Sequence, residues 1–372
     1  MTNELVQRAR ELAPMLVANS ARIERERALG SDVATALARA GLLRMAVPRS
    51  IGGPEHTPRE MVEAIEAVAH ADSAAGWCVS IHSTTSLAAG YLPIEGAREV
   101  FADPMDIACG VFAPMGKGVR EEGGVRVKGR WPFASGCEHS HWRLVGFVME
   151  GGTMMQGIVR ASDTRMIDTW SAAGLRGTGS HDMVIEDALI ADRFLLSLSG
   201  KAREETPLYR FPIFGLLSLA ISAVTLGIGR AALDAFGELA KTKKQAGSSR
   251  TLAERETVQT ELARAEASLR AARAYMLGTI DEVFARAEHE SSMSLADRGA
   301  LRLAATYASE RATGVVDVVQ RMAGSASVYE THPFGRFHRD VHVATQHLMV
   351  SDTTYTMCGR AMLGLPVQES AF

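Results

Sequence analysis

The sequence is poor in cysteine, poor in aromatic residues and without an excess of positive charge. Its four cysteines form no CxxC pair and stand far apart, at Cys78, Cys109, Cys137 and Cys358. This spacing predicts neither a zinc knuckle nor a disulfide framework, so free buried thiols in a reducing compartment are expected. Lysine and arginine number 40 against 43 acidic residues, for a net charge of −3, and they form no basic stripe. A nucleic-acid partner is therefore not expected.

Long apolar runs are also missing. No uninterrupted run reaches the ~18 residues that a membrane-crossing helix needs. The opening stretch, MTNELVQRARELAP, has no apolar core of a secretory signal and follows the pattern of an amphipathic helix. These absences predict a cytoplasmic protein with no membrane partner.

Two familiar nucleotide and hydrolase signatures are absent as well. The chain contains no GxSxG elbow and no GxxxxGK[ST] loop, which disfavours hydrolases of that kind and P-loop enzymes. Residues 227–232 (GIGRAA) match GxGxxA, but a dinucleotide-binding turn needs a preceding strand. The residues before this segment continue a helical pattern. Small residues that let two helices approach closely explain the segment better.

What the chain does contain is a core-forming composition in three successive patterns. Apolar residues make up 47% of its 372 residues. Residues 1–104 follow helical spacing, with Thr57-Pro58 as a capped helix start. Residues 105–200 contain short β-rich runs punctuated by glycine, which predict an antiparallel β domain. These runs are 107–112, 125–129, 143–148, 156–160 and 183–188.

Residues 201–372 return to helical spacing. An apolar stripe through Val258, Leu262, Leu269 and Met276 predicts one long helix. Others are expected from residue 214, over 295–322 and over 341–363. Four long helices with short connections predict a four-helix bundle. The fold class is therefore α+β: an N-terminal all-α domain, a middle antiparallel β domain and a C-terminal four-helix bundle.

The first chemically notable cluster is 129–142 (GRWPFASGCEHSHW). Its aromatic rings offer flat walls for a planar ligand. A serine hydroxyl both donates and accepts, which suits a flavin nitrogen whose protonation changes with redox state. An ordinary Trp-rich hairpin in a β core explains the same residues.

A second cluster, 168–182 (DTWSAAGLRGTGSHD), is rich in glycine and hydroxyl groups. The GTGS segment within it offers backbone N–H groups and two hydroxyls for a pyrophosphate. A glycine-rich β-turn without a ligand fits equally well.

The third cluster is 334–342 (FGRFHRDVH), followed by 344–347 (ATQH). His338 and His342 stand four residues apart on an expected helix, a spacing that can hold a metal. No further ligand pair accompanies them in the sequence, so no metal is expected. A helix start with ion pairs, or a single histidine that transfers a proton, remain the two interpretations.

Together these clusters resemble the acyl-CoA dehydrogenase superfamily. More narrowly, 131–136 (WPFASG), 174–180 (GLRGTGS), 339–342 (RDVH) and 344–347 (ATQH) are similar to the two-component flavin-dependent monooxygenases, and 72–77 (DSAAGW) resembles a helix start in that branch. The resemblance follows the order of the three regions over nearly the whole chain.

The resemblance implies roles for individual residues. Ser135 is expected to hydrogen-bond flavin N5, His342 to lie near the reactive C4a side, and His82 to lie in the pocket as a weaker candidate. The implied cofactor-binding set is Trp131, Phe133, Ser135, Gly136, Thr178, Ser180, Gln320, Gly324 and Ser325, the last three serving a neighbouring subunit.

The implied activity is that of an oxygenase component. It uses reduced flavin (FMNH2 or FADH2) and O2, through a C4a-hydroperoxide, to hydroxylate a small aromatic or apolar substrate. A separate NAD(P)H:flavin reductase and a homotetramer are expected. An FAD-dependent acyl-CoA dehydrogenase is the alternative, but 341–363 contains no Glu, only Asp352, and 214–236 only Asp234. A non-catalytic flavin-binding relative is the second alternative.

Overall fold

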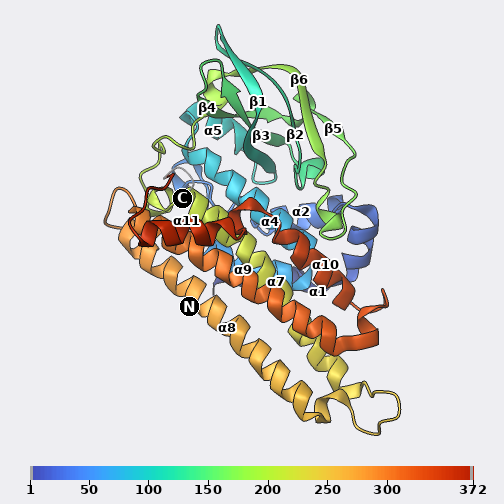
Figure 1. Cartoon of the computed structure of the whole chain (residues 1–372). Helices are drawn as coiled ribbons and strands as arrows, with labels where there is room; N and C mark the ends of the chain where they lie inside the picture. Colours follow the sequence, from blue (N-terminus) through green and yellow to red (C-terminus); the bar gives the residue numbers. More distant parts are fainter. Residues whose placement is uncertain (1–2, 369–371) are drawn as a thin grey trace.

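The computed structural model describes residues 3–368 and 372, and it places a sheet on one side of a large helical body (Figure 1). The first helices are α1 (Glu4–Glu26), α2 (Ser31–Arg39), α3 (Pro58–Ala71), α4 (Ser73–Thr85) and α5 (Ile94–Val100). Thr57 and Glu60 form the reciprocal capping box of α3, with Pro58 at its first position. The helix start expected at Thr57-Pro58 is confirmed.

A seven-stranded sheet follows, with strand order β5-β6-β2-β1-β3-β4-β7. Its strands are β1 (Ala108–Glu121), β2 (Gly124–Trp131), β3 (Trp142–Met149), β4 (Met154–Arg160), β5 (Arg165–Ile167), β6 (Asp182–Ala191) and β7 (Leu195–Leu196). All five expected strands are present. The sheet is mixed rather than purely antiparallel, because β3 returns after the β1–β2 hairpin and pairs parallel to the free edge of β1.

The remaining helices are α6 (Pro207–Arg210), α7 (Ile213–Thr242), α8 (Glu256–Ala287), α9 (Leu295–Ala323), α10 (Phe334–Ala344) and α11 (Thr353–Met362). The expectation of one helix over 341–363 was wrong. The chain leaves the helix after Ala344, and the imidazole of His347 accepts the backbone N–H of Met349 instead. This local side-chain bond competes with a continuing helix.

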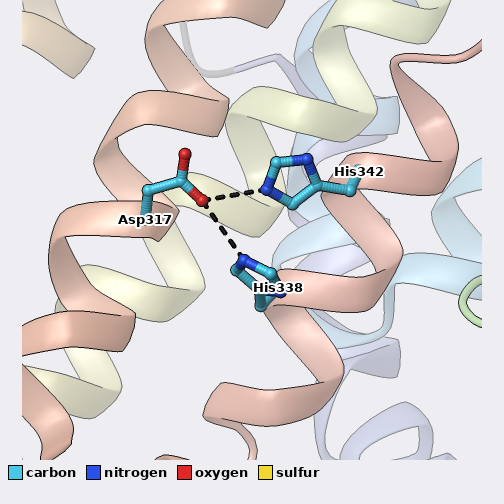
Figure 2. A group of neighbouring side chains, drawn as sticks. All are labelled: Asp317, His338 and His342. Atoms are coloured by element: carbon cyan, nitrogen blue, oxygen red, sulfur yellow. Dashed lines mark hydrogen bonds and ion pairs between the residues drawn. The ribbon is translucent and has the colours of Figure 1, made fainter.

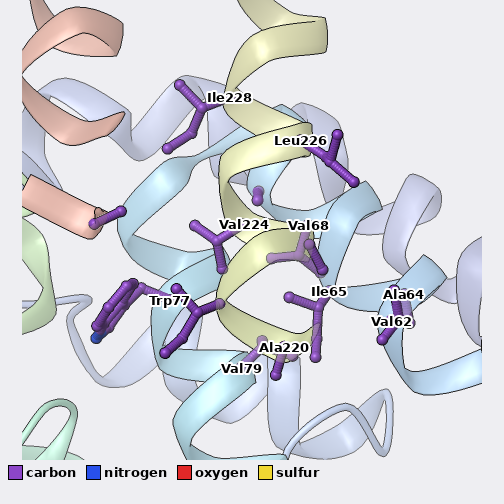
Figure 3. Packing of buried hydrophobic residues seen from close by; sticks show 14 of the residues in the cluster. Val62, Ala64, Ile65, Val68, Trp77, Val79, Ala220, Val224, Leu226 and Ile228 are labelled. Atoms are coloured by element: carbon purple, nitrogen blue, oxygen red, sulfur yellow. The ribbon is translucent and has the colours of Figure 1, made fainter. Parts of the chain in front are cut away.

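The long helix α7 forms the centre of the helical body. It packs against α3 and α4 (Figure 3) and also against α9. By length and composition α7 qualifies as a membrane span, but 94% of its apolar window is buried within the protein. A Cβ at Gly227 would lie 2.5 Å from the carbonyl of Glu66 and 2.7 Å from Cβ of Ala69. The GxGxxA segment therefore lies inside a helix and permits close approach to α3, as expected.

Helices from both ends of the sequence share one hydrophobic core, whereas the sheet has a core of its own. The loops that connect strands near Ser135 and Ser180 face the helical body and contact α4. Rigid elements lie on both sides of this junction, so it can hold side chains in fixed positions.

Candidate functional site

Ser135 lies in the loop that follows β2, at the junction between the sheet and α4. The loop is held to residues 178–181 by two backbone hydrogen bonds, from Ala134 N to His181 O at 3.0 Å and from Gly136 N to Thr178 O at 2.8 Å. The Ser135 side chain is 4% exposed. Its hydroxyl is therefore fixed from both sides rather than free to rotate into solvent.

The Ser135 hydroxyl is one member of a chain of hydrogen bonds. Trp77 Nε1 donates to Ser135 Oγ at 3.0 Å, and Ser135 Oγ lies 2.7 Å from Ser180 Oγ. Ser180 Oγ lies 2.6 Å from Thr178 Oγ1, which donates to the Leu175 carbonyl at 2.8 Å. Three hydroxyls thus connect an indole N–H to a backbone carbonyl.

The chemistry of the two ends fixes the direction of this chain. A carbonyl only accepts, so the one proton of Thr178 is directed at Leu175. Thr178 can then only accept from Ser180, and Ser180 can only accept from Ser135. With one lone pair occupied by Trp77 N–H, Ser135 Oγ keeps one lone pair and no proton for a ligand. That leftover acceptor fits a single N–H donor, such as N5–H of a reduced flavin.

His82, on α4, lies close to this loop and is almost fully buried. Its Nδ1 lies 2.8 Å from the Ala108 carbonyl, so Nδ1 carries the proton and Nε2 keeps a lone pair. Burial lowers the pKa of His82 to about 4, against the smaller raising effect of the Ala108 carbonyl. A Cβ at position 136 would lie 2.4 Å from this Nε2, so Gly136 is required beside the ring.

His347 is the second imidazole at this junction, and no role for it was predicted from the sequence. Its ring meets the ring of Trp77 edge-on at 5.9 Å. Its Nδ1 accepts Met349 N–H at 3.2 Å, so the neutral ring carries its proton on Nε2. Burial, and then the charge of Arg302, lower the pKa of His347 to about 4. The ATQH motif contained the signal, but only the turn after α10 brings it to Trp77.

The two aromatic residues expected to line the flavin ring differ in placement. Trp131 is fully buried in the core of the sheet, where its Nε1 donates to the Gly146 carbonyl at 2.7 Å. Trp131 therefore packs inside the sheet core and does not line an open surface. This matches the alternative interpretation of a Trp-rich hairpin in a β core. Phe133 is 69% exposed and meets the ring of Trp170 edge-on at 6.2 Å. Phe133 and Trp170 provide an exposed aromatic surface two residues from Ser135.

The glycines of the second cluster are explained by close packing. A Cβ at Gly174 would lie 2.3 Å from the Arg339 carbonyl, and one at Gly177 would lie 2.1 Å from Cγ2 of Ile23. Thr178 and Ser180 direct their hydroxyls into the buried chain rather than towards a phosphate. In the structure, the glycines permit close packing and the two hydroxyls join the hydrogen-bond chain beside Ser135, which matches the interpretation of a glycine-rich turn.

Asp340 on α10 anchors the far end of the hydroxyl chain. Its carboxylate accepts Leu175 N–H at 2.6 Å and the hydroxyl of Ser73. Burial raises the pKa of Asp340 to about 6, although both hydrogen bonds lower it. These bonds fix the Leu175 peptide, whose carbonyl accepts the hydrogen bond from Thr178 Oγ1.

The structure does not join His342 to this site. His342 Nε2 lies 2.9 Å from Asp317 Oδ1 on α9, and His338 Nε2 lies 3.4 Å from the same oxygen (Figure 2). The three side chains are between 34% and 42% exposed. The structure thus places His342, which was predicted to lie near the flavin, in a half-exposed cluster between α9 and α10.

Gln320, Gly324 and Ser325 lie together at the end of α9. Gly324 and Ser325 are exposed, and Lys243 Nζ donates to Ser325 Oγ at 3.2 Å and to the Ala323 carbonyl. Gln320 Oε1 is buried without a hydrogen-bond partner. The neighbouring Val328 and Tyr329 are exposed, so this end of the helix presents an apolar surface to its surroundings.

The two carboxylates considered as the base of an acyl-CoA dehydrogenase are poorly placed. Asp352 is exposed at the start of α11. Asp234 is 53% exposed and pairs with Arg230 and His70. Neither carboxylate has the buried environment of Ser135, so the structure supports the missing-base argument drawn from the sequence.

Comparison with known families and proteins agrees along the chain. Residues 2–94 match the family model for the N-terminal domain of acyl-CoA dehydrogenase, and residues 219–352 match the model for its C-terminal domain. The chain is 32% identical to indole-3-acetate monooxygenase of Pseudomonas putida, over 92% of this chain and 89% of that protein. It is 26% identical to the flavin-dependent monooxygenase oxygenase subunit HsaA of Rhodococcus jostii, over 98% of this chain and all of that protein.

Solved structures give the same grouping. XiaF from a Streptomyces species, in complex with FADH2 and glycerol, has a TM-score of 0.91 and 28% identity, covering 98% of this chain and 96% of XiaF. The 3-HSA hydroxylase from a Rhodococcus species has a TM-score of 0.93 and 26% identity, covering 99% of both chains.

Proposed function

Because the chain belongs to the acyl-CoA dehydrogenase family, in its flavin-dependent monooxygenase branch, we propose that it is the oxygenase component of a two-component system. The observation that carries the proposal is the Ser135 hydroxyl, which keeps one acceptor lone pair at a buried junction. Reduced flavin, when bound, supplies the electrons that activate O2. A separate NAD(P)H:flavin reductase delivers the flavin as FMNH2 or FADH2.

Ser135 discriminates between the redox forms of the cofactor. The hydroxyl chain leaves it an acceptor, which matches the N5–H donor of reduced flavin. Oxidised flavin offers an acceptor at N5 instead, so binding it requires Ser135 to turn its proton away from Ser180. Losing that bond costs about 1 kcal/mol, or roughly a fivefold to tenfold difference in affinity.

His82 and His347 hold complementary proton positions at neutral pH. His82 presents an unprotonated Nε2, which accepts a proton or a hydrogen bond from a substrate N–H or O–H. His347 presents a protonated Nε2, which donates to a developing oxygen anion. Both rings are neutral at pH 7, because burial lowers both pKa values to about 4. We assign these two residues the acid–base roles, in place of His342.

The substrate class is a small planar aromatic compound. Indole-3-acetate is the substrate named for the P. putida relative, and the Trp77–His347 and Phe133–Trp170 ring pairs each offer aromatic contacts to an indole or phenol of similar size. The exposed ring of Phe133 beside Trp170 lies two residues from Ser135 and offers such a compound an edge to pack against.

We further propose a cytoplasmic homotetramer with domains at 1–104, 105–200 and 201–372. The buried, unpartnered Oε1 of Gln320 and the exposed Gly324, Ser325 and Tyr329 support a contact with the flavin of a neighbouring subunit. A bound subunit would cover this apolar end of α9 and supply the missing donor.

The direct test is incorporation of ¹⁸O from ¹⁸O2 into indole-3-acetic acid, with NADH and an added flavin reductase. We expect one labelled oxygen in the product. Ser135→Ala should lower product per NADH roughly fivefold or more, with matching H2O2 release, because one hydrogen bond is lost. Ser199→Ala, at an exposed serine that also pairs with a serine, is the matched control. Unlabelled aromatic substrates together with reduction of bound flavin by an acyl-CoA thioester would establish a dehydrogenase instead.

A further inference from the structure

The cluster of His338, His342 and Asp317 lies outside the Ser135 site and has no role in the proposed reaction. His338 and His342 stand one turn apart on α10, with ring centroids 4.5 Å apart. Asp317 faces them from α9, and a single carboxylate oxygen, Oδ1, contacts both Nε2 atoms (Figure 2). Two imidazoles and one carboxylate thus converge on one point from two helices.

Two of the three separations between the ligand atoms match those around a bound ion. Bonds of about 2.0–2.1 Å at tetrahedral or right angles place neighbouring ligand atoms about 2.9–3.4 Å apart. Asp317 Oδ1 lies 2.9 Å from His342 Nε2 and 3.4 Å from His338 Nε2, and all three ligand atoms lie within 4.8 Å of one another. The two helices therefore bring three ligand atoms together, and rotation of the side chains can adjust the distance between the two histidines.

The donor set identifies the class of ion. Two neutral imidazole nitrogens and one carboxylate suit divalent transition ions and not the all-oxygen preference of calcium or magnesium. The three side chains remain 34–42% exposed, so water can complete the coordination. We propose that Asp317, His338 and His342 bind a divalent ion of the zinc class, which joins α9 to α10.

The positive charge nearest in sequence is partly compensated. Arg339 is close enough for its charge to act on His338, but its guanidinium pairs with Glu24 and donates to the Ala173 carbonyl at 2.9 Å. The pair of His70 and Asp234 provides a useful contrast within the same chain. It has the same 2.9 Å contact and similar exposure but only one histidine, so it is an ordinary ion pair.

The ion would stabilise the position of α10, which carries Asp340 at the far end of the hydroxyl chain. Asp340 lies on α10 between the two histidines in sequence and holds Leu175 N–H on the opposite side of the helix. Fixing α10 against α9 therefore steadies the Leu175 carbonyl that directs the hydroxyls of Thr178, Ser180 and Ser135. The role is structural and leaves the chemistry to the Ser135 site.

The test uses the full-length protein without an affinity tag, stripped of metal by a chelator and titrated with Zn²⁺ in a calorimeter. A parallel titration with Co²⁺ is followed by its visible absorption. We expect one ion per chain, and a visible band that reports nitrogen and oxygen ligands. His338→Ala and Asp317→Asn should each weaken binding at least about tenfold, since even outer-shell changes cost 10- to 100-fold.

His70→Ala is the matched control, and it should bind Zn²⁺ as the wild type does. Circular dichroism checks that each variant is folded, and Asp317→Asn keeps the size of the side chain if an alanine variant does not fold. The proposal is overturned if the wild type binds no ion at equimolar concentration. It is also overturned if His338→Ala and Asp317→Asn bind as tightly as the wild type, because the ion then lies elsewhere.

Discussion

His342 and His347 are five residues apart in the sequence but lie in two different environments. His347 packs against Trp77 at the buried junction, and burial lowers its pKa to about 4. His342 lies half-exposed beside Asp317 and His338. The turn after Ala344 separates them, so His347 lies at the proposed reaction site and His342 lies in the proposed ion-binding cluster.

The comparison shows that burial and hydrogen-bond direction, rather than the presence of histidine, decide what each imidazole can do. His82 and His347 are held in opposite neutral tautomers by a carbonyl and a backbone N–H. His338 and His342 share one carboxylate oxygen and face solvent. The first pair suits proton transfer at neutral pH, and the second suits a cation.

The largest expected effect is a difference in activity between the His347→Ala and His342→Ala variants. His347→Ala should lower the rate of product formation by about 100-fold or more, because it removes a positioned proton donor. His342→Ala should lower it by no more than about threefold. Steady-state rates with indole-3-acetic acid and saturating reduced flavin measure both. A greater loss in His342→Ala than in His347→Ala would reverse the assignment.

The next effect concerns the pH dependence of stability. The folded-state pKa of His82 is lowered to about 4 from an ordinary 6.5, so the unfolded chain takes up the proton first as the pH falls. Stability is therefore lost below pH 6.5, by roughly 2 kcal/mol between pH 7 and pH 5 for this residue.

Urea unfolding of the wild type and of His82→Gln over this pH range isolates the contribution as the difference between the two curves. The substitution should remove that part of the acid sensitivity. Parallel curves would show that His82 is not the buried neutral group described here.

Trp131 tests whether the sheet core and the reaction site are separate. Trp131→Phe should reduce the free energy of unfolding by about 1–3 kcal/mol, because the Gly146 carbonyl loses its buried donor. Flavin affinity should change little, which equilibrium dialysis measures. A tenfold loss of flavin affinity at unchanged stability would show that Trp131 is part of the cofactor site.

The smallest effect concerns the direction of the hydroxyl chain. Ser180→Ala removes the acceptor of the Ser135 proton, so Ser135 becomes able to donate to N5. The preference for reduced over oxidised flavin should fall roughly fivefold to tenfold, the size of one hydrogen bond. Anaerobic fluorescence titrations with both redox forms measure it, and an unchanged ratio would show that Ser180 does not set the direction.

Much of the fold could be predicted from local patterns. The β-rich runs predicted the main strands because their periodicity and turn residues are local signals. The parallel pairing of β1 with β3 could not be predicted, since strand order depends on contacts between residues distant in the sequence. The break between α10 and α11 was missed because the side chain of His347 caps a short 3-10 helix, Leu348–Val350, which apolar spacing does not reveal.

The candidate site was predictable only in part. Ser135, Thr178 and Ser180 were chosen from two separate motifs, and the structure joins them in one chain of hydrogen bonds. The roles of Trp131 and His342 depended on which way their side chains point, and a motif does not contain that information. Asp317 had no local signal at all, because it meets the two histidines only through the packing of α9 against α10.

The most direct test of the Ser135 site is the ratio of dissociation constants for oxidised and reduced flavin, measured anaerobically with the wild-type protein. We predict that reduced flavin binds at least about fivefold more tightly, because the fixed hydroxyl chain leaves Ser135 an acceptor for N5–H. Equal affinities, or tighter binding of the oxidised form, would contradict both the direction of the chain and the role of Ser135.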